Sequence, residues 1–203
     1  MTPLATELVA RGFTRFIPEL FDQQCALMRA HVDFTDLATL EIGARDGRHS
    51  EAALAMGASQ ATALELRPGA SRRIERTRPV QFVYGDCRLI HLPGTYDVVM
   101  AYGIVYHVPD PAALIRRLLG WSHGWVFLST HCGDHDRDAA GGYRGEFRQE
   151  GTDDIDAANP VPSLWLERSE LRRAITDAGG QIVQELYYMV GAVPAVWIAV
   201  RHE

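Results

Sequence analysis

Lysine is absent from this chain of 203 residues, so arginine supplies all 20 of its basic side chains. Without a lysine amine no Schiff base to a carbonyl substrate can form at a lysine, and enzymes that depend on one are excluded. Cysteine is scarce as well: there are three, at Cys25, Cys87 and Cys132. An odd, scattered set predicts a reducing compartment, with neither a disulfide framework nor a paired-cysteine zinc site.

Long apolar runs are also missing. The longest, Tyr187 to Val200, is interrupted by Gly191 and Pro194 and is too short to span a bilayer. Met1 to Ala10 has neither the basic start nor the long apolar core of a signal peptide, so we expect a cytoplasmic protein without a membrane partner. The net charge of −6 argues against broad contact with a phosphate backbone, so no nucleic-acid partner is expected.

What the chain does contain is a glycine-rich turn, read as T-L-E-I-G-A-R-D-G-R-H-S from Thr39 to Ser50. The apolar run Leu37 to Ile42 predicts a strand, and a helix-like pattern begins near Asp46. Gly43 permits a tight turn between the two, and Gly47 lets the backbone approach a ligand. Free amides at the start of the helix would face that ligand.

Apolar strands then alternate with helices along the chain. We expect strands over 60–66, 79–84, 96–101 and 124–130, with helices over 67–76 and 110–119. This alternation is typical of a parallel sheet covered on both faces. A helix over 163–180 is followed by two strands, 181–190 and 192–200, whose short connection at Gly191 makes them an antiparallel hairpin.

Polar side chains stand where several predicted strands end, and ligands of open α/β sheets bind there. Glu65 closes the second strand about 22 residues beyond Gly43, a spacing at which a carboxylate reaches ribose hydroxyls. Asp86 follows the third strand and could accept a hydrogen bond from an amino group such as that of adenine. Tyr102 to His107 follow the fourth strand.

With these residues in view, the sequence resembles the class I methyltransferases that use S-adenosylmethionine, over roughly Leu37 to Arg201. The resemblance implies a Rossmann-like three-layer α/β sandwich. Its mostly parallel seven-stranded sheet would end in an antiparallel hairpin. The cofactor-binding residues it implies lie in the glycine-rich turn and at the strand ends: Glu41, Gly43, Ala44, Arg45, Gly47, Glu65, Leu66, Asp86, Cys87 and Ala101.

Arg45 departs from the family pattern, because the first motif often has a central glycine there. It could crowd the turn or meet a carboxylate of substrate or cofactor. Within the family the sequence is similar to two groups. One is the methyltransferase-like domain of wobble-uridine tRNA carboxymethyltransferases, through Tyr106 to Pro111; the other is the small-molecule enzymes of natural-product pathways, through Ser129 to His131 and Gly142 to Gly145. The acidic charge and short N-terminus favour the second.

Methyl transfer is an in-line displacement that sometimes needs a base, and histidine titrates near neutrality. We therefore take His107 and His131, at the predicted strand ends, as candidate catalytic residues. Candidate substrate contacts are Tyr106, Tyr143, Arg144 and Trp165. His131, Asp134, His135 and Asp136 are crowded into one loop without regular ligand spacing, so we predict no metal site.

The sequence thus predicts a single methyltransferase domain over residues 1–203, with a helical cap over 1–35 and a lid over the substrate site at 131–162. The expected reaction is methyl transfer from S-adenosylmethionine to an oxygen or nitrogen of a small molecule. Three alternatives stay open: a tRNA-modifying enzyme that uses S-adenosylmethionine or a carboxylated derivative, a nicotinamide oxidoreductase, and a non-catalytic regulatory domain that binds the cofactor. The acceptor and the oligomeric state are not predicted.

Overall fold

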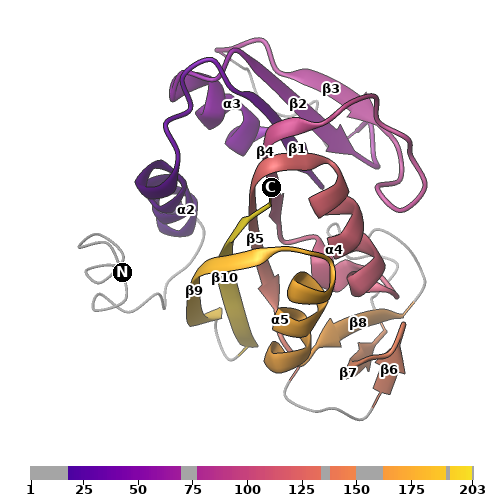
Figure 1. Cartoon of the computed structure of the whole chain (residues 1–203). Helices are drawn as coiled ribbons and strands as arrows, with labels where there is room; N and C mark the ends of the chain where they lie inside the picture. The colour runs from indigo at the N-terminus through magenta and orange to yellow at the C-terminus, as the bar shows by residue number, and fades with distance from the viewer. Residues whose placement is uncertain (1–17, 70–76, 134–137, 150–161, 191–192, 203) are drawn as a thin grey trace.

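The structure, a computed structural model, describes residues 18–69, 77–133, 138–149, 162–190 and 193–202. Its centre is a seven-stranded sheet in the order β3-β2-β1-β4-β5-β10-β9 (Figure 1). The strands are β1 (Ala38–Ile42), β2 (Gln60–Glu65), β3 (Gln81–Tyr84), β4 (Tyr96–Tyr102), β5 (Ser122–His131), β9 (Gln181–Val190) and β10 (Val193–Arg201). Strands β1 to β5 run parallel, whereas β10 is antiparallel to both β5 and β9. The expected sheet and its closing hairpin are confirmed.

Helices cover both faces of this sheet, giving three layers (Figure 1). The helices α4 (Pro111–Gly120) and α5 (Arg168–Asp177) pack on one face, and α2 (Pro18–His31) and α3 (Arg48–Ala55) pack on the other. Strand β4 shows why all its residues from Val98 to Ala101 are apolar. Val99 and Ala101 join the core under α4, while their neighbours Val98 and Met100 join the core under α2 and α3.

The ends of several predicted elements agree with the structure for the expected reasons. Asp110 caps α4, its carboxylate accepting from the N–H of Ala113 at 2.9 Å, and Pro111 occupies the first turn. After α3 the chain turns at Gly57, whose φ of 113° a residue with a Cβ rarely adopts. Residues 1–17 of the predicted cap and 70–76 of the predicted helix 67–76 lie outside the described residues.

The prediction of a helix over 163–180 is wrong in its first residues, because the segment after β5 contains a second sheet. Its three antiparallel strands are β6 (Asp138–Ala140), β7 (Tyr143–Arg148) and β8 (Ser163–Leu166). Strand β8 replaces the start of the helix predicted over 163–180, so that α5 begins only at Arg168. Leu164 and Leu166 are buried on alternate positions of β8, a strand periodicity that four residues express too briefly to be recognised.

The second sheet falls partly within the predicted lid of 131–162, of which residues 134–137 and 150–161 are outside the described part of the chain. Gly145 allows β7 and β8 to approach closely, because a Cβ there would lie 2.2 Å from the carbonyl oxygen of Trp165. Among the described residues, no helix combines the length and the apolar character needed to cross a bilayer.

Candidate active site

A cavity of about 900 Å³ lies beyond the carboxyl ends of the parallel strands. The strand order reverses between β1 and β4, and open α/β sheets bind their ligands at such a point. The lining of the cavity includes most of the predicted cofactor-binding residues: Glu41, Gly43, Ala44, Arg45, Glu65, Leu66, Asp86 and Cys87. It also includes the predicted catalytic and substrate residues Tyr106, His107 and His131. The structure therefore brings these residues together at one cavity.

The glycine-rich turn after β1 depends on its two glycines. Gly43 and Gly47 have φ angles of 66° and 76°, and a Cβ on Gly47 would lie 2.7 Å from the ring of Phe82. Arg45 also adopts a positive φ, 50°, which is uncommon for a residue with a side chain. The turn closes through the N–H of Gly47, which donates to the Ala44 carbonyl at 2.7 Å. Gly47 is not in the cavity lining, so it acts by shaping the turn.

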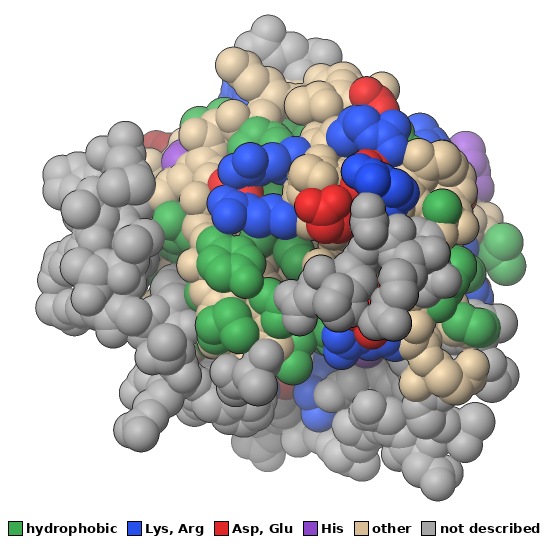
Figure 2. All heavy atoms as spheres, turned by 90° about the horizontal axis from the view of Figure 1, so that it is seen from below, with side chains coloured by type: hydrophobic (Ala, Val, Ile, Leu, Met, Phe, Trp, Pro, Cys, Tyr) green, Lys and Arg blue, Asp and Glu red, His purple; other side chains and the backbone are tan. Residues whose placement is uncertain are grey.

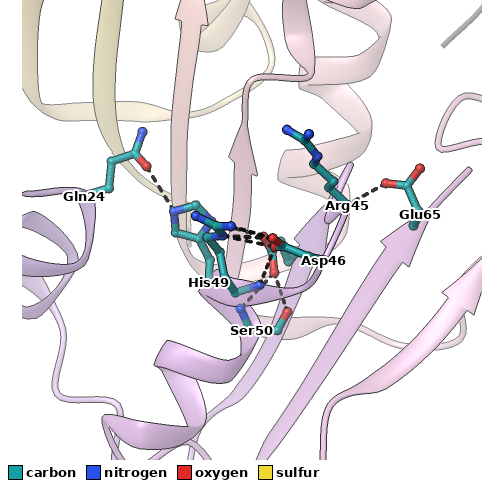
Figure 3. A network of polar contacts seen from close by, with 8 residues as sticks. Gln24, Arg45, Asp46, His49, Ser50 and Glu65 are labelled. Carbon is teal, nitrogen blue, oxygen red and sulfur yellow. Dashed lines mark hydrogen bonds and ion pairs between the residues drawn. The ribbon is translucent and has the colours of Figure 1, made fainter. Parts of the chain in front are cut away.

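Glu41 supplies the cap that helix α3 lacks. The N-cap residue of α3 is Gly47, which has no side chain to accept a hydrogen bond. In its place Glu41 Oε2, from β1, accepts from the N–H and the hydroxyl of Ser50 at 2.8 and 2.7 Å (Figure 3). A carboxylate at the N-terminus of α3 also interacts favourably with the positive end of the helix dipole. Glu41 is 3% exposed, so its main contacts in this structure build the turn.

His49, for which we predicted no role, continues this network to helix α2. Its Nδ1 lies 3.1 Å from Glu41 Oε1 and its Nε2 lies 3.0 Å from Gln24 Oε1 (Figure 3). The imidazole is buried between the rings of Phe21 and Tyr102, at centroid distances of 4.9 and 4.4 Å. No pattern in the sequence could pair residues 24 and 49, since only the fold places α2 beside α3.

Glu65 ends β2 as predicted, with 3% of its surface exposed. Its Oε2 accepts from the N–H of Arg45 at 2.8 Å, which ties the two neighbouring strand ends together (Figure 3). Its Oε1 accepts from the N–H of Arg67 at 3.0 Å and lies 3.4 Å from the guanidinium Nε of the same residue. The carboxylate is therefore held rigidly at the cavity wall, next to Leu66.

Asp86, after β3, is held in the same way. Arg88 donates to both carboxylate oxygens, with Nη2 at 2.6 Å from Oδ2, and its N–H donates at 2.9 Å to Oδ1. These hydrogen bonds and the positive charge hold the pKa of Asp86 below its usual value, although desolvation opposes them. Burial raises the pKa of the neighbouring Cys87 thiol to about 11. A neutral, buried thiol is not a reactive nucleophile.

An acidic residue followed two positions later by arginine occurs at three places in the lining. The pairs are Asp46–Arg48, Glu65–Arg67 and Asp86–Arg88. Arginine and acidic side chains also stand side by side on the face seen in Figure 2, next to hydrophobic side chains. The repeated spacing was visible in the sequence, but the pairing needs the turn after each strand, and we did not predict it.

The other end of the cavity is lined by rings. Tyr106 and His107 lie on the short 3-10 helix η2 (Val105–His107), and His131 ends β5. The ring centroid of Tyr106 is 4.1 Å from that of His107 and 4.5 Å from that of His131. Desolvation, and then the nearby His107 and Arg148, lower the pKa of His131, whereas its contact with the Pro194 carbonyl opposes them. His131 is therefore neutral at pH 7.

The remaining candidates lie elsewhere. Tyr143 donates to Asp177 at 2.9 Å and Arg144 donates to Glu170 at 3.1 Å, so both fasten β7 to α5 rather than line the cavity. Trp165 lies behind His131 and is not in the lining. Ala101 is fully buried within the sheet. Within the described ranges, no cluster of His, Cys, Asp or Glu could hold a metal ion; Asp134 to Asp136 are outside those ranges.

Comparison with known proteins identifies the family. A family model described as a methyltransferase domain matches residues 7–185. A ubiquinone biosynthesis O-methyltransferase of Paraburkholderia xenovorans (strain LB400) is 33% identical over 109 residues, which are 50% of this chain and 47% of that protein. One of Bordetella bronchiseptica (strain ATCC BAA-588 / NCTC 13252 / RB50) is 35% identical over 101 residues, 45% of this chain and 41% of that protein. The chain thus matches less than half the length of these curated relatives.

Solved structures share the fold. The N-terminal domain of EvdMO1 with SAH bound has a TM-score of 0.70 and 22% identity, with 89% of this chain and 81% of that chain covered. Magnesium protoporphyrin IX methyltransferase from Synechocystis PCC 6803 with bound SAM has a TM-score of 0.66 and 15% identity, with 91% of this chain and 79% of that chain covered. With its fold, its glycine-rich turn and the match to the family model, the chain belongs to the class I S-adenosylmethionine-dependent methyltransferases.

Proposed function

We propose that this chain transfers the methyl group of S-adenosylmethionine to an oxygen of a small, uncharged acceptor, with His131 as the general base. The observation that carries the proposal is the unequal lining of the cavity. The relatives named as O-methyltransferases support an oxygen acceptor. Because this chain matches less than half the length of these relatives, they support the reaction type and not the acceptor itself.

The charged side chains of the lining belong to one end of the cavity. They come from the ends of the first three strands and from the segments that follow them: Glu41, Arg45, Asp46, Arg48, Glu65, Arg67, Asp86 and Arg88. The lining from β4, η2, β5, β9 and β10 instead offers rings, hydroxyls and aliphatic groups: Tyr102, Ile104, Tyr106, His107, Val108, Ser129, Thr130, His131, Tyr188, Val190 and Ala195. The described residues offer no opposite charge at this second end to replace the hydration that a charged acceptor would lose there.

The charged end fits an adenosyl group. The Glu65 carboxylate can accept hydrogen bonds from ribose hydroxyls, and Asp86 can accept one from the adenine amino group. Gly43 lines this end of the cavity, and a Cβ there would lie 3.0 Å from Ile104, another residue of the lining. When bound, the cofactor supplies a methyl group activated on a sulfonium. The chain holds this group and the acceptor in line, which is the main source of acceleration in such a displacement.

His131 suits the role of base because its imidazole is neutral at pH 7 and can accept the proton of an acceptor hydroxyl. Tyr106 and His107 stand beside it and would orient the acceptor. The neighbouring hydroxyls of Ser129 and Thr130 lie in the same part of the lining and could hold further polar groups of the acceptor. The helix α2 adds Leu20 and Phe21, which would help to exclude water.

Calorimetry with S-adenosylmethionine and its demethylated product tests the cofactor half of this proposal. We expect Glu65→Ala to weaken binding by about 1–3 kcal/mol, because ribose hydroxyls lose a charged acceptor. Glu170→Ala is the matched control: Glu170 is a buried glutamate paired with arginines, and it is not in the lining. Equal affinity of Glu65→Ala and the parent protein would overturn the assignment of Glu65.

The acceptor half is tested by transfer of a radiolabelled methyl group to a panel of small hydroxylated molecules. Members of the panel are paired so that they differ only in the presence of a carboxylate or an amine. We expect turnover of the uncharged members, and its loss in His131→Gln with cofactor affinity retained. Preference for the charged members, or full activity of His131→Gln, would refute this half.

A further inference from the structure

The second sheet brings a tryptophan and an arginine to the back of His131. Trp165 lies on β8 and Arg148 on the neighbouring strand β7, where Arg148 pairs with Ser163 and Glu146 pairs with Trp165. The Cζ atom of Arg148 is 3.9 Å from the centroid of the Trp165 ring. A guanidinium at this distance over an indole is a favourable cation–π contact. The two side chains therefore form one unit on this face of the sheet.

Trp165 stacks on the His131 imidazole, and Tyr106 contacts the same imidazole. The two ring centroids are 4.9 Å apart and the ring planes differ by 10°. Tyr106 meets His131 edge-on at 4.5 Å and 68°, and its ring is 5.3 Å from Trp165. The imidazole is thus held by two aromatic rings, one from η2 and one from the second sheet.

Hydrogen bonding contributes little to this arrangement. The His131 Nδ1 atom is 3.4 Å from the Pro194 carbonyl oxygen, which is at the limit of a hydrogen bond. Trp165 Nε1 and Arg148 Nε are buried, and neither has a hydrogen-bond partner among the described residues. Ring stacking, rather than polar contacts, fixes the direction in which the imidazole points.

The charges around His131 also favour its neutral form. Arg148 approaches from β7 behind the indole, and His107 approaches from η2 on the far side of Tyr106. On β7, the Glu146 carboxylate accepts a hydrogen bond from Arg148 Nη2 at 3.1 Å. Among the described residues, the acceptor that faces the imidazole is the Pro194 carbonyl of β10. Protonation would place a second cation near Arg148 in a partly desolvated site.

We propose that Trp165 and Arg148 are positioning residues: their stack sets the orientation of the His131 imidazole and keeps it unprotonated. This inference rests on the proposed function, since it explains how His131 would be available as a base. It gives the second sheet a role in the site, through residues that do not line the cavity. It also replaces the expectation that Trp165 contacts the substrate directly.

The test is an NMR titration of the full chain labelled in histidine, with the His131 signal assigned from the spectrum of His131→Gln. We expect Arg148→Met to raise the pKa of His131 by about half a unit, because the cation is lost while the aliphatic stem is kept. Arg148→Lys should restore the parent value. Trp165→Leu should change the titration and the ring-proton shifts of His131, and Trp165→Phe should restore most of both.

The exposed His123, which faces Asp97 far from the second sheet, is the internal control and should titrate alike in all variants. An unchanged His131 titration in both Arg148→Met and Trp165→Leu, with the fold intact by circular dichroism, would overturn the inference. The experiment needs no acceptor, so it is separate from the proposed reaction. If the His131 pKa rises in Arg148→Met but the acid limb of the pH–rate profile stays in place, the base assignment of the proposed function fails instead.

Discussion

Arg45 occupies a backbone conformation that glycine adopts without strain. Its φ of 50° lies in the left-handed region, which costs a residue with a Cβ roughly 1–2 kcal/mol. Glycine loses more conformational entropy on folding than other residues, so this loss would offset part of the strain that a glycine variant relieves. The residue stays in the turn with its N–H bonded to Glu65 at 2.8 Å.

We therefore expect Arg45→Gly to raise the free energy of unfolding by up to about 1 kcal/mol, measured by urea denaturation. The control is Arg45→Ala, which loses the guanidinium but keeps the Cβ and should show no such gain. If both variants have the same stability, strain at Arg45 is not the cause. Because Arg45 lines the cavity, a loss of cofactor affinity shared by both variants would report on the guanidinium.

For single residues, the sequence predicted the positions of the acidic residues of the site better than the side-chain contacts between distant elements. Glu65 and Asp86 stand at the strand ends where the alternation of elements put them, because strand ends follow from local patterns. The contacts of His49 with Gln24 and Glu41 join α2, α3 and β1, so no local pattern reveals them. The stack of Trp165 on His131 was equally hidden, since it depends on an unpredicted sheet.

The buried pairing of His49 gives a test of how helix α2 is held. His49→Phe keeps a ring between Phe21 and Tyr102, but leaves Glu41 Oε1 and the Gln24 amide without their partner. Buried polar groups without partners cost about 1–3 kcal/mol, so we expect a loss of that size in unfolding free energy. His123→Phe, at an exposed histidine, should change stability by less than about 0.5 kcal/mol. A loss below that limit in His49→Phe would contradict the buried network.

Helix ends allow a second comparison between elements. Asp110 caps α4 with its carboxylate, whereas Glu167, the N-cap residue of α5, makes no such hydrogen bond with its side chain. We expect Asp110→Ala to lower the unfolding free energy by about 1 kcal/mol. Glu167→Ala should have a smaller effect in the same denaturation assay. Equal losses at the two positions would show that the Asp110 side chain does not act as a cap.

The elements that sequence analysis missed share a physical reason. Strands β6 and β8 have three and four residues, too few for alternation to be distinguished from chance. In β7, Gly145 takes an inward position that an apolar side chain would otherwise mark. The long strands β5 and β10 were predicted because ten and nine residues of mostly apolar sequence carry a clear signal.

Over the whole molecule, the absence of lysine simplifies the response to alkaline pH. Arginine stays protonated at every pH at which the fold can be studied, so cysteine and tyrosine are the side chains that titrate between about pH 8.5 and 12. Burial raises the pKa of Cys25 and of Tyr188 to about 12 and that of Cys87 to about 11, and it raises the pKa of Tyr102 as well. These groups are neutral in the fold.

In the unfolded chain the same thiols and phenols ionise near pH 8.5 and 10. Above about pH 8.5 the folded state therefore binds more protons than the unfolded state, and the free energy of unfolding must fall as pH rises. The stabilisation is fully present below the pKa values of the unfolded groups and is lost progressively up to about pH 11–12. We expect the urea concentration at the unfolding midpoint to decrease as the pH is raised from 8 to 10.5.

The double variant Cys25→Ala and Cys87→Ala should show a shallower fall than the parent, because two of the groups that drive it are removed. Tyr84→Phe is the control, because Tyr84 is 45% exposed and is not one of the buried groups named above. Repeating the series at higher ionic strength separates this effect from general charge repulsion, because salt screens repulsion between exposed charges. If the double variant loses stability as steeply as the parent, these two thiols do not set the alkaline limit, and the buried phenols of Tyr102 and Tyr188 become the leading cause.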